Sequence, residues 1–287
     1  GAGSEHHGPP SRIASTMEKL EHELWIVQAA NAVFGRMVNA FLGLFGLQAA
    51  DPAHPIPNYL VMVFLIAALL VALAFLLRSR LSVENPGRLQ IVFEDAVNAL
   101  GGMLDDIVGP KGRRYLPLVA TVGVFILCGN LIGLVPGFMA PTSSINVTLG
   151  CALTVWIYYH IQGVREQGLL AYLKHFAVPP GAPAFIAPIM LPIEIISHLS
   201  RVLSLSLRLF GNIFGEELVI VILFSIVPFV VPLPMMFLGI ITGSLQAFIF
   251  VMLTMIYLSG AVAAEHGHED AHAHAHRPAR HAEGVAA

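Results

Sequence analysis

Five long apolar runs constrain this chain more than any other feature of its sequence. They cover residues 59–77, 115–136, 146–163, 188–228 and 232–260. A helix rises 1.5 Å per residue, so about 20 apolar residues cross a hydrocarbon core of roughly 30 Å. Only 11% of the 287 residues are charged and 56% are hydrophobic, which leaves too little polar surface for a water-soluble globule. We therefore predict an all-α polytopic membrane protein with about five transmembrane helices.

Several classes of function are disfavoured by what the sequence lacks. The net charge of −3 is not the basic footprint of a nucleic-acid-binding protein, so no nucleic-acid partner is expected. Cys128 and Cys151 lie inside apolar runs, where they read as small core residues rather than a disulfide scaffold. The chain contains no GxxxxGK[ST], and its one match to HExxH, at 268–272, lies in the alternating histidines of the tail rather than in an apolar-periodic helix. We expect no catalytic residue, no cofactor and no metal site.

Lysine and arginine residues predict the orientation of the chain. The connections at 135–145 and 228–234 contain none, whereas the connections after the first and third runs are rich in them. Because positive loops stay in the cytoplasm, the N-terminus is expected outside and, after five crossings, the C-terminus inside. The positive residues of the two cytoplasmic connections are Arg78, Arg80, Arg88, Lys111, Arg113, Arg114, Arg165 and Lys174.

The fourth run is too long for an upright helix. Counted from Pro183 to Pro228, it has about 45 residues, which as one helix would reach roughly 68 Å, over twice the bilayer core. Pro183, Pro188 and Pro192 are expected to interrupt its beginning, since an interior proline removes a backbone bond. The remaining residues favour one steeply tilted helix, which forms a hairpin with the last run. Two crossings are the alternative.

Three segments lie outside the membrane spans. Residues 89–108 carry apolar side chains at helical spacing with acids between them, which predicts an amphipathic helix on the cytoplasmic membrane surface. The N-terminal segment 1–55 is expected outside, with an amphipathic stretch at 17–46. The membrane domain then covers 56–262. The His-rich tail 263–287 is predicted to be cytoplasmic and disordered.

The fourth run contains charges that a membrane span should not have. An intramembrane charge costs at least about 2.5–3.5 kcal/mol on insertion scales, so each one is a functional candidate. At 100° per residue, six polar side chains of this run fall along one face of the helix and form a polar stripe, whereas Glu217 falls on the opposite face. The stripe consists of Glu194, Ser197, Arg201, Ser204, Arg208 and Asn212; His198 lies near it, and Glu216 is a further charge in the same apolar run.

Arg208 and Gln246 need partners that their own helices do not supply. No acid lies three or four residues from Arg208, which suggests a partner carboxylate on another chain. Arg201 and Glu194 also allow a purely structural reading, as an ion pair between helices. In the last run, Thr242, Gln246 and Tyr257 share one face. An unpaired amide is costly in hydrocarbon, so we expect Gln246 to pair with the antiparallel helix before it.

These motifs resemble the signature of subunit a of F-type ATP synthases. The run SLSLRLFGN at 204–212, followed by Glu217-Leu218, carries the resemblance together with LQAFIFVMLTMIYL at 245–258. Supporting matches are GPKGRRYLP at 109–117, NLIGLVPG at 130–137 and NVTL at 146–149. The resemblance covers roughly residues 80–260.

The resemblance implies a role for each candidate residue. Arg208 matches the arginine that faces the carboxylates of the rotating c-ring. Glu217, Asn212 and Gln246 match the lining of the half-channel from the outer side, with Glu216 as a further candidate, and Glu194 and Ser197 match the cytoplasmic half-channel. His198 is a candidate relay beside it. A bacterial subset of the family has Gly and His where this chain has Glu216 and Gly239.

The mechanism that the resemblance implies uses two offset proton half-channels joined only through a rotating carboxylate, so that proton flow is coupled to ring rotation and ATP synthesis. The expected partners are c-ring subunits, b-type peripheral stalk subunits, membrane lipid and, indirectly, the catalytic sector that performs the ATP chemistry. The expected location is a bacterial plasma (inner) membrane.

An autonomous ion transporter or channel is the alternative function, although the inverted repeats common in transporters are not visible in the sequence. A membrane metalloenzyme using the histidines of the tail is a third reading.

Overall fold

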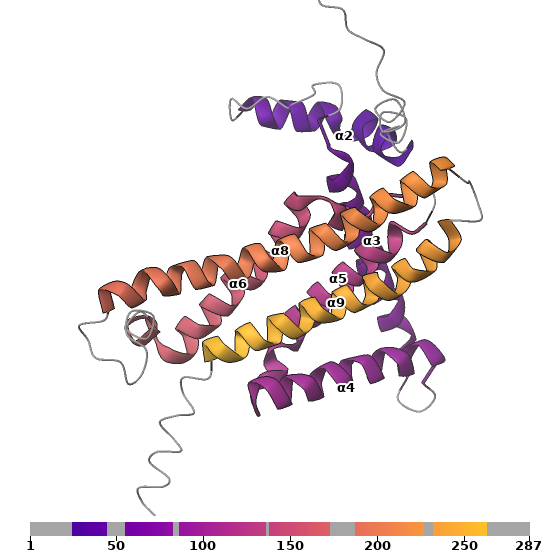
Figure 1. Ribbon diagram of the computed structural model, residues 1–287. Helices are drawn as coiled ribbons and strands as arrows, with labels where there is room; N and C mark the ends of the chain where they lie inside the picture. Colours follow the sequence, from indigo (N-terminus) through magenta and orange to yellow (C-terminus); the bar gives the residue numbers. More distant parts are fainter. Residues whose placement is uncertain are drawn as a thin grey trace, which may run out of the picture.

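The computed structural model describes residues 25–44, 55–82, 86–135, 138–172, 187–226 and 232–262, and within these ranges the chain is helical and has no strand (Figure 1). The expected all-α membrane architecture is confirmed. Four helices are long and apolar enough to cross a membrane. They are α3 (Asn58–Arg80), α5 (Leu116–Ile132, preceded by the 3-10 turn η1, Gly112–Tyr115), α8 (Ala187–Ile226) and α9 (Pro232–Val262).

The third expected span corresponds to α6 (Ile145–Gln167). This helix is 23 residues long, but it is not among the four most apolar helices, because side chains such as Tyr159, His160 and Gln162 interrupt its apolar sequence. Even so, α6 packs against both α8 and α9. The number of crossings therefore stays a prediction.

Two further helices lie at opposite ends of the bundle (Figure 1). The helix α4 (Arg88–Val108) matches the amphipathic surface helix expected at 89–108, and α2 (Trp25–Leu44) lies in the amphipathic N-terminal stretch. Asn31 of α2 exchanges two hydrogen bonds with the backbone of Ile56, at 3.1 and 3.0 Å, and this joins α2 to the start of α3. Residues 1–24 and 45–54 of the N-terminal segment and the tail 263–287 lie outside the described residues.

The helix α8 corrects one expectation. Pro188 and Pro192 were predicted to interrupt its beginning, but the helix starts at Ala187 and continues through both. Since the first turn of a helix has no intrahelical acceptor for its N–H groups, Pro188 removes no bond and Pro192 removes one in the second turn. The third proline, Pro183, lies outside the described residues. The single unbroken helix of 40 residues supports one crossing rather than two.

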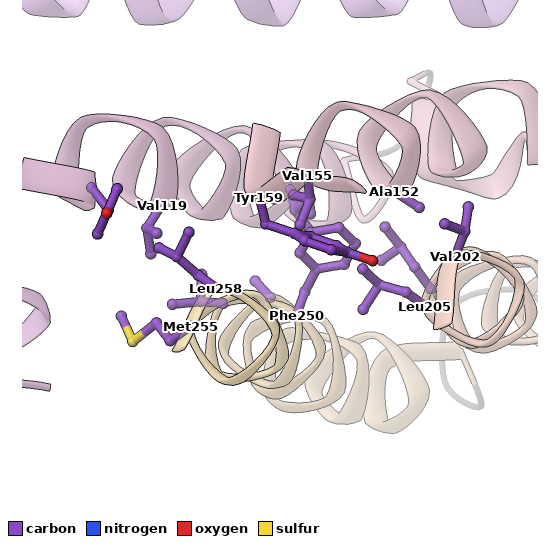
Figure 2. Packing of buried hydrophobic residues seen from close by; sticks show 14 of the residues in the cluster. Val119, Ala152, Val155, Tyr159, Val202, Leu205, Phe250, Met255 and Leu258 are labelled. Atoms are coloured by element: carbon purple, nitrogen blue, oxygen red, sulfur yellow. The ribbon is translucent and has the colours of Figure 1, made fainter. Parts of the chain in front are cut away.

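The core lies between α5, α6, α8 and α9 (Figure 2). The helices α8 and α9 run side by side as an antiparallel hairpin, oblique to α3 in Figure 1, and α5 packs along α9. Glycine allows the close approach of α5 and α9: a Cβ on Gly123 would lie 2.6 Å from Cγ2 of Val251. Small residues serve this purpose generally where membrane helices touch.

Polar side chains lock this core at the loop between α5 and α6, which contains the 3-10 turn η2 (Pro141–Ser143). Buried Asn130 donates to the carbonyl of Gly243 at 2.9 Å and accepts from the hydroxyl of Thr142 at 2.7 Å. These bonds connect α5, α9 and η2, and they satisfy an amide that would be costly if left unpaired in a dry core.

Candidate functional site

The polar stripe of α8 lies partly on the outside of the bundle. Ser204, Arg208 and Asn212 are exposed, and Glu194 and Ser197 are half-buried. Exposed Leu203 and Leu207 flank the stripe, so the surface around it is apolar. On the other face of α8, Val202, Leu205 and Leu209 are buried against α6 and α9. The helical period predicted from the sequence therefore separates a packed face from a face that carries Arg208.

Arg208 forms no ion pair with any of the described residues. Its guanidinium keeps its charge at any attainable pH and offers five N–H donors. A charge of this kind on an apolar exterior is costly without a counter-ion. The arrangement is suited to a carboxylate presented by another molecule.

The expected partner of Gln246 is found on α8. The amide of Asn212 donates to Oε1 of Gln246 at 2.8 Å, which bridges the hairpin close to Arg208. Gln246 is buried, and its own amide nitrogen has no hydrogen-bond partner in the part of the chain that the structure describes. A buried donor left open in this way is suited to an ordered water or a partner's oxygen.

Glu217 points away from the stripe, toward the loop between α5 and α6. Its Oε1 accepts a hydrogen bond from the backbone N–H of Ala140 at 2.9 Å. Ala140 is followed directly by η2, so the carboxyl lies next to the loop that Asn130 and Thr142 hold in place. The structure thus places Glu217 within the bundle, about two and a half helical turns from Arg208.

Glu216 lies between α8 and α9. Its Oε2 accepts from the hydroxyl of Thr242 at 2.9 Å. The carboxyl fills the space above Gly239, where a Cβ would overlap it and would lie 2.8 Å from Leu134 Cδ2. Glu216 occupies this position because residue 239 has no side chain.

Glu194 lies at the opposite end of the stripe. Its Oε1 is 3.2 Å from Nε2 of His198. Arg201 does not form the structural ion pair with Glu194 that the sequence allowed; its guanidinium lies over the ring of Tyr257, 5.4 Å from the ring centroid. All three polar residues of the α9 face, Thr242, Gln246 and Tyr257, therefore contact α8.

The acidic residues thus form two groups along α8, with Arg208 between them. Arg208 lies 14 positions after Glu194 and 9 positions before Glu217, or about 21 Å and 14 Å along the helix axis. Chemically, each group is suited to accept and release a proton, and the permanent cation between them disfavours a proton on the stripe. Within the described ranges, no three metal-ligating side chains gather at one point.

Comparison with known proteins gives the family. The family model described as ATP synthase A chain matches residues 60–259. ATP synthase subunit a 1 of Syntrophotalea carbinolica is 50% identical over 203 residues, which cover 71% of this chain and 85% of that protein. ATP synthase subunit a of Koribacter versatilis is 39% identical over 250 residues, which cover 87% and 100% respectively. The chain belongs to the ATP synthase subunit a family.

Membership of the subunit a family confirms the resemblance seen in the motifs around Arg208 and Gln246. A subunit a is a non-catalytic membrane subunit, so the expectation that this chain is not itself an enzyme is confirmed by the family. The roles of the individual site residues stay predictions.

The sequence reading missed several groups that the structure brings to the site. Ala140 supplies a backbone N–H to Glu217, and no side chain signals such a contact in advance. The hydroxyl of Tyr159 forms a hydrogen bond with Nδ1 of His198, although in the sequence Tyr159 looks like an ordinary core aromatic residue of an apolar run. Thr242 stood on the expected polar face of α9, so its contact with Glu216 was within reach of the helical period.

We expect Gly239→Ala to lower the thermal stability of the purified subunit. The new methyl group would force the Glu216 carboxyl off Thr242, at a cost of about 1 kcal/mol for the lost hydrogen bond. The matched control is Gly260→Ala, because a Cβ there meets nothing within 4 Å. In a Glu216→Ala background, where the overlap and the hydrogen bond to Thr242 are both already absent, Gly239→Ala should lower the stability less than it does in wild type. Equal melting temperatures for Gly239→Ala and Gly260→Ala would show that Glu216 does not occupy this space.

Proposed function

We propose that this chain is the proton-conducting subunit of the membrane sector of a rotary F-type ATP synthase. Protons enter through one half-channel, bind a carboxylate of a rotating c-ring, and leave through a second half-channel after the ring has turned. A single continuous channel would dissipate the gradient. Two offset half-channels make each proton travel with the ring, and this couples proton flow to rotation and to ATP synthesis in a separate catalytic sector.

One observation carries the proposal: Arg208 is an exposed, unpaired cation among the described residues of an apolar helix face. In the proposed mechanism it stabilises the ionised form of the ring carboxylate that faces it, so that the carboxylate releases its proton there. The same charge repels protons that would otherwise pass directly between the half-channels.

The remaining site residues line the two half-channels. The outer half-channel contains Glu217, Asn212, Gln246 and, beside them, Glu216. The inner half-channel contains Glu194, Ser197 and His198. The hydrogen bond between Asn212 and Gln246 and the contact of Glu217 with Ala140 support the outer group, since they bring α8, α9 and the loop before α6 to one place.

We further propose the assembly and its location. The partners are c-ring subunits at the Arg208 face, b-type peripheral stalk subunits and membrane lipid, and the catalytic sector is reached only through them. The chain would lie in the plasma (inner) membrane of a bacterium, with its N-terminus outside and its C-terminus in the cytoplasm. The asymmetry of lysine and arginine supports this orientation.

The test of function is co-purification followed by transport. An affinity-tagged chain should recover an oligomeric c-ring from detergent extracts, and vesicles containing the complex should acidify when ATP is added. An autonomous transporter would be recovered without a ring and would move its ion without ATP hydrolysis. Recovery of the chain alone, with full transport activity, would overturn the proposal.

Cysteine labelling is expected to place the two ends of the bundle on opposite sides of the membrane. A cysteine introduced at Ser144, close to η2, should react with an impermeant maleimide from outside. A cysteine introduced at the exposed Leu170, just after α6, should react only after the cells are opened. Cys128 and Cys151 are first replaced by alanine. Labelling of both positions from the same side would contradict the orientation.

A further inference from the structure

A chain of hydrogen-bonding groups leads from the inner end of the stripe into the bundle. Oε1 of Glu194 is 3.2 Å from Nε2 of His198, and Nδ1 of the same imidazole is 2.9 Å from the hydroxyl of Tyr159. Glu194 and His198 lie on α8, whereas Tyr159 lies on α6. The imidazole therefore connects two helices through its two nitrogen atoms.

Tyr159 is held rigidly within the core. Its side chain is 2% exposed, and Figure 2 shows its ring among the apolar residues between α6, α8 and α9, with the hydroxyl end toward Val202 and Leu205 of α8. His198 is also buried. Because neither ring is free to turn in a packed core, the geometry of the chain is set by the fold rather than by solvent.

Several other titratable groups surround His198. The ring of His160 meets it edge to face at 4.9 Å, and Nδ1 of His160 lies 2.9 Å from the carbonyl of Trp156. The titratable and charged groups that face this cluster from α8, α6, the turn after α6 and α9 are Glu194, Arg201, Tyr159, His160, Tyr172 and Tyr257.

The donors and acceptors allow one consistent assignment for the state in which the imidazole is neutral and Glu194 is ionised. An ionised carboxylate only accepts, so Nε2 of His198 carries the hydrogen that faces Glu194. The other nitrogen, Nδ1, is then an acceptor, and the hydroxyl of Tyr159 donates to it. The partner of one imidazole nitrogen determines which tautomer is present at the other.

We propose that Tyr159 is a positioning residue for the inner half-channel: its hydroxyl holds His198 in the Nε2–H tautomer that faces Glu194. This inference rests on the proposed function, because it assigns Tyr159 to a half-channel that the function requires. Tyr159 does not itself carry the transported proton. It acts through His198, and this dependence can be measured.

The transport test compares Tyr159→Phe in two backgrounds. Removing only the hydroxyl should slow ATP-driven acidification about fivefold, the rate equivalent of one lost hydrogen bond, and should change the dependence of the rate on cytoplasmic pH. In His198→Gln, no imidazole remains for the hydroxyl to orient, so Tyr159→Phe should have a clearly smaller effect there than in wild type. Equal losses in both backgrounds would overturn the proposal.

Tyr158→Phe is the matched control. It also removes a hydroxyl from α6, but its ring packs edge to face on Tyr115 instead of His198. It should pump at the wild-type rate with an unchanged pH profile. Loss of activity in Tyr159→Phe that is no greater than in Tyr158→Phe would count against the inference.

A spectroscopic measurement covers the case in which Tyr159→Phe assembles poorly. Nitrogen-15 chemical shifts of labelled histidine distinguish the two tautomers, and the His198 signal is the one missing from His198→Gln. Wild-type complex should show Nε2–H at His198, and the opposite tautomer there would overturn the proposal. Glu194→Gln distinguishes failure of the proposed function from failure of this inference. Normal pumping by Glu194→Gln would refute the inner half-channel itself. Impaired pumping by Glu194→Gln, together with normal pumping by Tyr159→Phe, would refute only the role of Tyr159.

Discussion

Arg208→Ala is expected to abolish ATP-driven proton pumping and to open a passive proton leak through the membrane sector. In the proposed mechanism, loss of the guanidinium leaves nothing to hold the ring carboxylate ionised, and it removes the positive barrier between the two half-channels. The catalytic sector should still hydrolyse ATP after it is detached, since no residue of this chain takes part in that chemistry. The measurements are acidification of vesicles by ATP and passive proton flux under an imposed potential.

Arg208→Lys should also abolish coupled transport. Lysine keeps a cation but loses the planar fork of donors, and a desolvated ammonium can release its proton where a guanidinium cannot. The control is Arg165→Lys, an equivalent change at an exposed position in the last turn of α6, which should pump normally. Normal pumping by Arg208→Ala would refute the proposed mechanism.

Glu217→Gln is expected to slow ATP-driven pumping by about a hundredfold or more, the scale of a lost proton-transfer group. The amide oxygen can still accept the hydrogen bond from Ala140, so the local structure should persist while the ability to carry a proton is lost. Glu217→Asp should be milder, because a carboxyl group remains. Pumping is measured across a range of pH.

The adjacent acid requires its own control. Glu216 lies on α8 beside Glu217 and faces Thr242, so it is the group able to replace the lost carboxyl. If it does so, Glu216→Gln combined with Glu217→Gln should be more severe than either change alone. Glu94→Gln on the exposed surface of α4 should have no effect. A wild-type rate for the double variant at every pH would remove both acids from the proton path.

The helical period predicted the part of the site that depends on direction along a single helix. It separated Arg208 from Glu217 and placed Gln246 on the face of α9 that meets Asn212. The positions of the helices could also be predicted from the sequence: α4, for example, begins one residue before the expected segment 89–108. Long apolar runs and amphipathic periods are local properties, and a local property can be seen in one stretch of sequence.

Contacts that depend on backbone groups or on packing between distant helices were not accessible in this way. The bond from Ala140 to Glu217 joins residues 77 positions apart and uses an N–H that every residue except proline carries. The behaviour of Pro192 depends on its nearness to the helix start, which the sequence does not mark clearly. Tyr159 resembles any other aromatic residue of the core until its hydroxyl is seen next to His198.

The unbroken backbone of α8 has a mechanical consequence. Membrane helices kink where a proline or an inserted group interrupts the backbone bonds, and no proline occurs between Glu194 and Glu217. The helix also continues through Gly211 and Gly215. If a c-ring turns against Arg208 as proposed, the sideways load on α8 would therefore pass into α6 and α9, which contact α8 along its packed face. Glu194 and Glu217 would then keep their spacing along α8 while the load is applied.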